Sequence, residues 1–433
     1  MYFIFYVLTI SVCLSTWMFE VSGNKVLLIS MDGFRWDYIE QVDTPNFDAF
    51  AVNGTRAQYI NGSFVTKTFP SHFTMATGLY EESHGIIANS MYDPEFNEYF
   101  NKRSKETKWW DGGEPLWITA RKQGLKSAAY FWPGDEAKIK GLRPNIHFKF
   151  DGTIPFRSRI DSAVQWLSDD IDLVMVYLSE PDTTGHLFGP NTPQVRSKVK
   201  EMDDLLGYIV DAFDKASLWD TVNVIITSDH GMTEVDYANK HVDLSNFIDM
   251  NVVDAIPTTG PTANILPRVD MEQEIIDNLT NVPHIKVYSK DDIPEHWHYK
   301  EHRRILPVLV VAEEGWVALK GPEEYSEPDL GAHGYDNTLS TMKPIFYARG
   351  PNIKQGFESL PFSIVDIYPL VCKLLCLKPA PNNGTLDNTK YFIVNDNSES
   401  CPRVTSSSSR NYLQIYMLAI LSLFLISPIR NIL

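Results

Sequence analysis

The sequence predicts an α/β fold in which helices cover both faces of a central, largely parallel β-sheet. Four apolar runs rich in β-branched residues have the continuous hydrophobic character of strands that are buried on both faces. These runs lie at 26–30, 172–178, 222–227 and 344–348. Helical patterns at 158–167 and 194–213 lie between the second run and its neighbours along the chain, and the longer one gathers its apolar residues on one face. Strands that alternate with helices in this way favour an open, mostly parallel sheet.

Length and composition favour one large domain. The chain has 433 residues, 44% of them hydrophobic, which is enough to bury a sizeable core, and no linker or repeat divides residues 24–400. There are 55 acidic and 38 basic residues, so the formal net charge is 38 − 55 = −17. An acidic surface repels a polyanion, and the chain has no basic run with interleaved aromatic residues. We therefore expect no nucleic-acid polymer as a partner, although a small nucleotide held by metal ions remains compatible.

Both ends of the chain indicate an extracellular protein attached to a membrane. Residues 1–19 are uncharged and mostly apolar, and small residues follow them, which predicts a cleaved signal peptide over 1–23, with an uncleaved anchor as the alternative. A polar stalk at 401–411 precedes an apolar run at 412–429. That run suits a single transmembrane segment of a type I protein or the discarded tail of a GPI signal. In either case the domain at 24–400 would lie at the cell surface, outside the plasma membrane.

Sequons agree with a secretory route. They predict N-glycosylation at Asn53, Asn61, Asn278 and Asn383, although a single sequon arises readily by chance. The cysteines add little, because Cys372, Cys376 and Cys401 form neither a disulfide framework nor a zinc-ribbon pattern, and their pairing stays open.

Acidic and imidazole side chains follow the predicted strands where each strand ends. They are Asp32 after the first strand, Asp182 and His186 after the second, Asp229 and His230 after the third, and His333 in a glycine-flanked loop. Taken singly, an Asp after a strand is commonly a turn or helix-cap residue, and a lone His is commonly structural. The carboxyl ends of parallel strands meet at one edge of the sheet, so we expect the whole set to converge there.

Such a cluster predicts a metal site. Three close carboxylates would repel one another and raise each other's pKa, and divalent cations remove this conflict. A set of Asp and His ligands without thiolates suits zinc, and its size suits two ions. The expected first site consists of Asp182 and His186, which share one helical turn, together with His333. The expected second site consists of Asp32, Asp229 and His230.

A candidate nucleophile lies in the segment 66–74. Thr68 precedes Phe69 and Pro70, a pattern that places it where a helix begins and where free backbone N–H groups attract anions. A helix cap is the alternative role for this threonine. Beside a metal ion its hydroxyl would have a lowered pKa and could attack phosphorus or sulfur.

Several strings of residues carry a resemblance to a known family. They are MDGFR (31–35), KTFP (67–70), GLYEESHGII (78–87), FWPG (131–134), EPD (180–182), TSDHGM (227–232) and HGYDN (333–337). In this order they resemble the ectonucleotide pyrophosphatase/phosphodiesterase family of the alkaline phosphatase superfamily, most closely its short membrane-anchored members. The likeness covers nearly all of residues 25–385. It implies an alkaline-phosphatase-like fold and an extracellular enzyme with two Zn²⁺ ions. Such an enzyme hydrolyses phosphodiester or pyrophosphate bonds of nucleotides, such as NAD, dinucleoside polyphosphates, ADP or ATP, to nucleoside 5′-monophosphates.

The resemblance also implies roles for particular residues. Thr68 would be the nucleophile and would share one zinc ion with Asp32, Asp229 and His230, whereas Asp182, His186 and His333 would bind the other. Asn89 would donate its amide to the phosphate, and Phe69 and Phe150 would stack on the base, which is worth about 1–3 kcal/mol per base. Two positions depart from the family pattern: Phe150 stands where relatives usually have Tyr, and Ser71 stands where they usually have Asn. Because Ser71 lies near the helix start, we expect it to change a cap and the local support of Thr68.

Other functions compete with this interpretation. A phosphomonoesterase of the same superfamily would use a similar metal set, and a choline-phospholipid phosphodiesterase would use the same scaffold. An inactive surface receptor or adhesion protein is the alternative of another class, but every expected metal position holds a competent ligand. The sequence disfavours a sulfatase, because the Cys/Ser-x-Pro-x-Arg string that generates its nucleophile is missing around Thr68.

Overall fold

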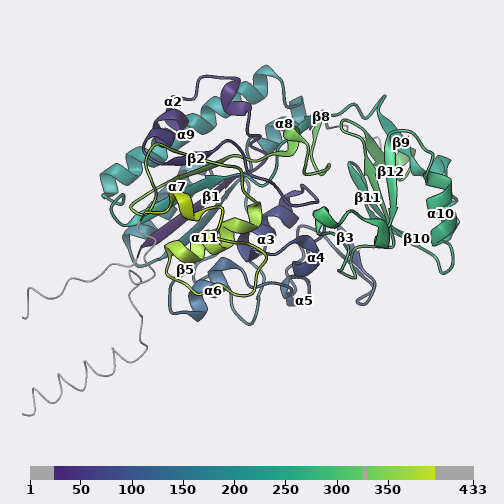
Figure 1. The fold of residues 1–433 in the computed structure, drawn as a ribbon, viewed down its shortest axis with the longest axis horizontal. Coiled ribbons are helices and arrows are strands. Elements are labelled where there is room, and N and C mark those ends of the chain that lie inside the picture. The colour runs from purple at the N-terminus through teal and green to yellow at the C-terminus, as the bar shows by residue number, and fades with distance from the viewer. Residues whose placement is uncertain (1–23, 325–328, 395–433) are drawn as a thin grey trace, which may run out of the picture. The chain divides into compact units, whose positions relative to one another are not determined.

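A seven-stranded sheet forms the centre of the structure, a computed structural model that describes residues 24–324 and 329–394 (Figure 1). The strands lie in the order β17-β2-β16-β7-β1-β6-β5. Strands β5, β6, β1 and β7 are parallel to one another, whereas β16 runs antiparallel to both of its neighbours. The bounds are β1 Lys25–Met31, β2 Thr55–Ala57, β5 Ser127–Tyr130, β6 Leu173–Leu178, β7 Val222–Thr227, β16 Phe346–Arg349 and β17 Phe357–Ser359. The prediction of a largely parallel sheet is confirmed, and the run at 344–348 is its antiparallel member.

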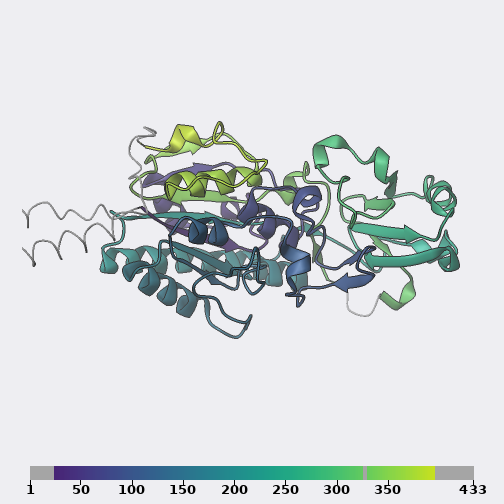
Figure 2. The ribbon, with the colours of Figure 1, turned by 90° about the horizontal axis from the view of Figure 1, so that it is seen from below.

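Helices cover both faces of this sheet, as predicted. Alternate residues of β1 enter two separate cores: Val26 and Leu28 face one, while Leu27 and Ile29 face the other. The first core packs against α3 (Thr68–Thr77), α6 (Leu116–Lys122) and α11 (Ile367–Leu374). The second packs against α2 (Pro45–Val52), α7 (Phe156–Ser168) and α9 (Pro193–Ala216). Figure 2 shows the yellow-green α11 and the teal α9 on opposite sides of the strands. The helices expected at 158–167 and 194–213 are therefore α7 and α9, each slightly longer than predicted.

A second sheet, which the sequence patterns did not reveal, lies in the chain between β7 and β16. It is antiparallel with the strand order β10-β11-β13-β12, and α10 packs on one face through Ile275 and Leu279 (Figure 1). Its elements are β10 Val253–Thr258, β11 Thr262–Pro267, α10 Glu272–Leu279, β12 Ile285–Ser289 and β13 Val308–Ala312. Smaller elements complete the described fold: β3 Met91–Asp93, β4 Glu98–Phe100, β8 Thr233–Glu234, β9 His241–Asp243, β14 Val317–Leu319, β15 Gly331–Ala332, α4 Glu81–His84, α5 Thr107–Trp110 and α8 Asp182–Phe188.

Several sequence predictions concern residues beyond the described ranges or remain untested. The expected signal peptide at 1–23, the stalk at 401–411 and the apolar segment at 412–429 lie outside the described residues. Among the helices that the structure describes, none combines the length and apolarity needed to cross a bilayer. Cys372 is a buried free thiol and Cys376 is disulfide-bonded. Three predicted glycosylation sites, Asn53, Asn278 and Asn383, are exposed. The fourth, Asn61, is partly buried.

A buried polar network fixes α3 against α4. The Ser63 hydroxyl donates to Glu81 Oε1 at 2.5 Å, and the Thr74 hydroxyl, which comes from α3, approaches the same oxygen at 3.3 Å. Glu81 is fully buried, and this burial raises the pKa of its carboxyl from 4.5 to about 8. The side chain is thus mainly a neutral acid at pH 7.

We expect Glu81→Gln to remove a pH-dependent loss of stability. As the pH rises from about 4.5 to about 8, the folded wild type keeps a proton that its unfolded chain has already released, so its free energy of unfolding falls. The variant has no proton to lose at this position. Its stability relative to wild type should therefore improve by about 2–4 kcal/mol between pH 5 and pH 9. Denaturant unfolding at pH 5, 7 and 9 measures the difference, with the exposed Glu274→Gln as control. A difference that stays constant with pH would contradict the buried neutral acid.

Candidate metal centre and active site

Three neighbouring strands deliver their acidic residues to one edge of the main sheet. Asp32 follows β1, Asp182 opens α8 just after β6, and Asp229 follows β7. Because β1 is paired in parallel with both β6 and β7, the carboxyl ends of the three strands lie side by side. The structure thus brings together residues that are up to about 200 positions apart, in the crevice where α/β sheets place their sites.

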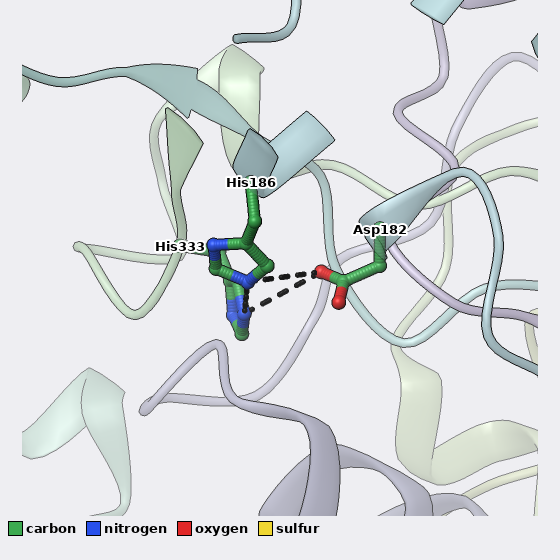
Figure 3. A group of neighbouring side chains, drawn as sticks. All are labelled: Asp182, His186 and His333. Carbon is green, nitrogen blue, oxygen red and sulfur yellow. Dashed lines mark hydrogen bonds and ion pairs between the residues drawn. The ribbon is translucent and has the colours of Figure 1, made fainter. Parts of the chain in front are cut away.

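One group of ligands consists of Asp182, His186 and His333, whose side chains converge in Figure 3. Asp182 Oδ1 lies 3.4 Å from His186 Nε2 and 3.6 Å from His333 Nε2. The Nδ1 atom of His186 donates to the Gly331 carbonyl and that of His333 to the Thr66 carbonyl, both at 2.8 Å. These bonds orient the Nε2 atoms, which face each other at 3.2 Å. Two imidazole nitrogens and a carboxylate oxygen that face one another at such distances favour a shared cation.

A second group consists of Asp32, Asp182 and His230. His230 Nε2 lies 3.4 Å from Asp32 Oδ1, and it also lies 3.0 Å from Asp229 Oδ2. The His230 and His333 rings stack with their centroids 3.5 Å apart, which joins the two groups. Asp182 therefore lies within reach of both groups, and the assignment of Asp182 to the ion of His186 and His333 stays a prediction.

Several ligand atoms of this centre lie close to one another but make no hydrogen bonds. Four buried atoms make no hydrogen bond to any described residue: Asp32 Oδ1, Asp182 Oδ1, Asp229 Oδ2 and His230 Nε2. Buried polar atoms are normally satisfied, so four such atoms in one cluster require an additional partner. Burial, with the neighbouring Asp229 and Asp182 carboxylates, raises the pKa of Asp32 well above its usual range. Divalent cations would satisfy all four atoms and remove this repulsion, so the residues fit the expected metal ions.

Thr68 is the first residue of α3 and is only 5% exposed. Lys67 occupies the cap position and makes no side-chain cap, so the alternative role of Thr68 as a helix cap is not observed. One turn later, His72 Nδ1 donates to the Thr68 carbonyl at 2.7 Å and lies 3.3 Å from Asp229 Oδ2. His72 thereby connects the start of the helix to the acidic cluster.

Asn89 lies beside the start of the same helix. Its Oδ1 accepts the Phe69 backbone N–H at 2.9 Å, so the amide oxygen is occupied and the NH₂ group is oriented away from that bond. An amide held in this way can donate to an oxyanion close to Thr68.

Ser71 does not act as a cap, which corrects the expectation from the sequence. Its hydroxyl is buried and makes no hydrogen bond to a described residue, and its backbone N–H donates to the Lys67 carbonyl within the helix. The position is already inside the first turn, where a side chain points into the packing and not toward the helix end.

A cavity of about 830 Å³ begins at this centre. Thr68 and Asp182 line it, and so do the predicted base-stacking residues Phe69 and Phe150. Phe150 is 54% exposed, so its ring is available for contact, although composition alone would place a phenylalanine in the core. The volume lies within the usual range of about 300–1,000 Å³ for small-molecule sites.

Two residues of the centre were not identified from the sequence. The Tyr177 hydroxyl donates to Asp32 Oδ2 at 2.5 Å from the neighbouring strand, where its backbone is in register with Ser30. His72 is the other one, and its Nε2 accepts from the Ser30 hydroxyl at 2.8 Å. Of these two residues, only His72 could have been found from the sequence, because it lies one helical turn after Thr68 in the expected helix. The position of Tyr177 depends on strand pairing, which the sequence did not provide.

Fold and site together define a class of protein: a hydrolase with an alkaline-phosphatase-like α/β fold. Its buried Asp/His cluster adjoins a threonine at a helix start and an open cavity. Residues 26–336 match the family described as type I phosphodiesterase/nucleotide pyrophosphatase. The chain belongs to this family of metal-dependent enzymes, and its activity is that of a nucleotide pyrophosphatase/phosphodiesterase.

Relatives and solved structures agree with this assignment. The bis(5′-adenosyl)-triphosphatase enpp4 of Mus musculus is 39% identical over 94% of this chain and 89% of its own length. Human ectonucleotide pyrophosphatase/phosphodiesterase family member 5 is 37% identical over 90% of this chain and 81% of its own. Among solved structures, an inactive threonine-to-alanine variant of murine ENPP5 in complex with AMP has a TM-score of 0.82 and 38% identity, covering 86% of this chain and 100% of that one.

Proposed function

We propose that this protein is an extracellular two-zinc enzyme that hydrolyses phosphodiester or pyrophosphate bonds of nucleotides and releases nucleoside 5′-monophosphates through a covalent threonine intermediate. One observation carries the proposal: Thr68 lines the same cavity as Asp182 and the two aromatic rings, next to buried ligand atoms that make no hydrogen bond. The murine ENPP5 complex supports it, because that protein is inactive as a threonine-to-alanine variant and binds AMP.

The proposed reaction is an in-line displacement at phosphorus. Thr68 Oγ forms a bond to the phosphorus attached to the nucleoside 5′-oxygen, and the bond to the leaving group breaks with its electron pair. Asn89, whose oxygen is held by the Phe69 N–H, donates its amide to the charged phosphoryl oxygens. Water then hydrolyses the nucleotidyl ester of Thr68 and regenerates the hydroxyl. When bound, the zinc ions would supply the lowered pKa of the hydroxyl and the neutralisation of phosphate charge.

The protein's own residues prepare the site for this chemistry. His72 fixes the Thr68 carbonyl through Nδ1, while the Tyr177 hydroxyl fixes one oxygen of Asp32. The Tyr177 bond leaves Asp32 Oδ1, which lies 3.4 Å from His230 Nε2, without a hydrogen bond, as supporting hydrogen bonds do around metal ligands.

Product analysis on a panel of substrates tests the proposed function. Purified protein is incubated with NAD, a dinucleoside triphosphate, ATP, ADP, AMP and a choline phospholipid, each with and without a chelator. We expect nucleoside 5′-monophosphates from the pyrophosphate-linked nucleotides, no reaction of AMP, and no product with the chelator. Phosphate released from AMP would indicate a phosphomonoesterase, and phosphocholine would indicate a phospholipid phosphodiesterase. No product with any substrate at saturating zinc would indicate an inactive receptor.

Base stacking predicts a selective effect of Phe150→Ala. The ring lies 5.2 Å from Phe131 at an angle of 61°, at the exposed side of the cavity that Phe69 also lines. Removal of one stacking face, worth about 1–3 kcal/mol, should lower kcat/KM for nucleotide esters about 5- to 150-fold. We expect little change for p-nitrophenyl phenylphosphonate, which has no base. Phe148→Ala, another exposed ring nearby, provides the control, and an equal loss on both substrates would contradict base stacking.

We also propose that the enzyme is attached to the cell surface. The support is the sequence of the two ends, with an apolar stretch within 1–23 and an apolar run at 412–429 after a polar stalk. Treatment of intact cells with phosphatidylinositol-specific phospholipase C distinguishes the two anchors. Release of activity indicates a GPI anchor, and retention indicates a spanning segment.

A further inference from the structure

A second cavity adjoins the one that contains Thr68. It has a volume of about 430 Å³ and is lined by Asn89, Ser90, Asn101, Lys102 and Arg103. Lys102 and Arg103 also line the larger cavity, so the two spaces share a cationic boundary. Asn89 connects the second cavity to the active site, because its side chain accepts the backbone N–H of Phe69, directly after Thr68.

The two cations at this boundary are available for an anion. Lys105, two positions further on, is neutralised by an ion pair with Glu136. Neither Lys102 nor Arg103 forms an ion pair with a carboxylate in the part of the chain that the structure describes, and both are exposed. The two residues therefore line the cavities without an ion pair among the described residues, although Asp135, Glu136 and Asp182 also line the larger cavity.

The loop that carries these cations is held in place. Asn101 Oδ1 accepts the Arg103 backbone N–H at 2.8 Å, and the Asn101 N–H donates to the Ser104 hydroxyl at 3.1 Å. The Ser104 carbonyl accepts the indole N–H of Trp110 at 3.0 Å, and Trp110 is a buried residue that lines the larger cavity. A fixed loop loses little conformational freedom when it binds a ligand, so its charges are preorganised.

We propose that Lys102 and Arg103 form a leaving-group subsite, which binds the additional phosphates of pyrophosphate-linked nucleotides and selects them over diesters whose leaving group carries no phosphate. The proposal rests on the proposed function, in which Asn89 contacts the reacting phosphate and the nucleoside occupies the larger cavity. The part of the substrate bonded to the other side of that phosphorus then reaches the cavity lined by Asn89, Lys102 and Arg103. Guanidinium and ammonium groups bind phosphate through charge-assisted hydrogen bonds, and the same charges repel a choline headgroup.

The test compares two substrates that share the adenosine 5′-phosphoryl group. ATP leaves pyrophosphate, whereas the p-nitrophenyl ester of AMP leaves a group without phosphate. For the double variant Lys102→Gln/Arg103→Gln we expect kcat/KM for ATP to fall at least about tenfold, while kcat/KM for the ester stays within about twofold of wild type. The matched control is Lys149→Gln, which removes a cation that lines only the larger cavity, and it should show no such selectivity.

The outcomes separate the subsite from the function on which it rests. If wild-type enzyme releases no AMP from either substrate, the proposed function fails. If wild type hydrolyses both, but the double variant loses both equally or neither, the subsite alone is wrong. The same selective loss in Lys149→Gln would also overturn the proposed subsite, because the effect would then follow from the loss of any positive charge near the cavity. Melting temperatures of the variants verify that the exposed loop substitutions leave the fold intact.

Discussion

Thr68→Ala is expected to abolish turnover of nucleotide esters while the metal ions remain bound. The hydroxyl is the proposed nucleophile, whereas none of the buried atoms that lack partners belongs to this side chain. Loss of the nucleophile lowers kcat about 10⁶-fold in a serine protease, and we expect a loss of at least about 10⁴-fold here. The measurements are the hydrolysis rate of a p-nitrophenyl nucleotide ester and the zinc content by mass spectrometry.

A covalent product gives a second, independent measurement for the same residue. Wild-type enzyme quenched in acid during turnover should carry one nucleotidyl group on the peptide that contains Thr68, and the alanine variant should carry none. Thr183→Ala is the matched control, since this threonine also lines the cavity and should retain nearly normal activity. Normal activity of Thr68→Ala, or a label on another residue, would refute the assignment.

Asp182→Ala is expected to disrupt both metal sites, because the Asp182 side chain participates in both ligand groups. His186 belongs to only one of them, so His186→Ala should lose mainly one ion. We expect activity to fall about 10³-fold or more in the Asp182 variant, since both charges that stabilise the reacting phosphate are lost. Excess zinc should restore more activity to the His186 variant than to the Asp182 variant.

Zinc stoichiometry of the purified variants is the decisive measurement. Asp204→Asn, which removes an exposed carboxylate on α9, controls for a general change of charge and should keep the wild-type metal content. Equal metal loss in the Asp182 and His186 variants would mean that the two groups do not share a ligand. Unchanged zinc content in both would exclude this cluster as the metal centre.

Continuous apolar runs predicted four of the seven strands of the main sheet, β1, β6, β7 and β16, and the strand ends predicted the place of the cluster, whereas β2, β5 and β17 were not predicted. Continuous apolar runs such as 222–227 belong to strands that are covered on both faces, and this burial leaves a clear mark on the sequence. The antiparallel direction of β16 could not be predicted, because a buried strand has the same continuous apolar pattern whether it runs parallel or antiparallel to its neighbours. In the second sheet, β10 is only partly buried and irregularly paired, so its pattern is weak, whereas β13 is a continuous buried apolar run that was overlooked in the sequence.

The parts of the site that could not be predicted from the sequence depend on contacts between different strands and loops. Asp182 was assigned to one ion because sequence spacing shows its proximity to His186, whereas its approach to the Asp32 and His230 pair depends on the pairing of β1 with β6. The contribution of Tyr177 depends on the same register. Lys102 and Arg103 lie in an ordinary polar loop by composition, and only the folded chain places them beside Asn89.

The position of His333 in the chain has a consequence for folding. It lies 147 residues after His186, and the whole second sheet, from Val253 to Ala312, is contained in the intervening stretch. A cation bound by both imidazoles would cross-link the two ends of this long segment. Such a cross-link removes many conformations from the unfolded chain. The supply of such a cation during synthesis would thus affect how much folded protein accumulates, in addition to the turnover rate of each molecule.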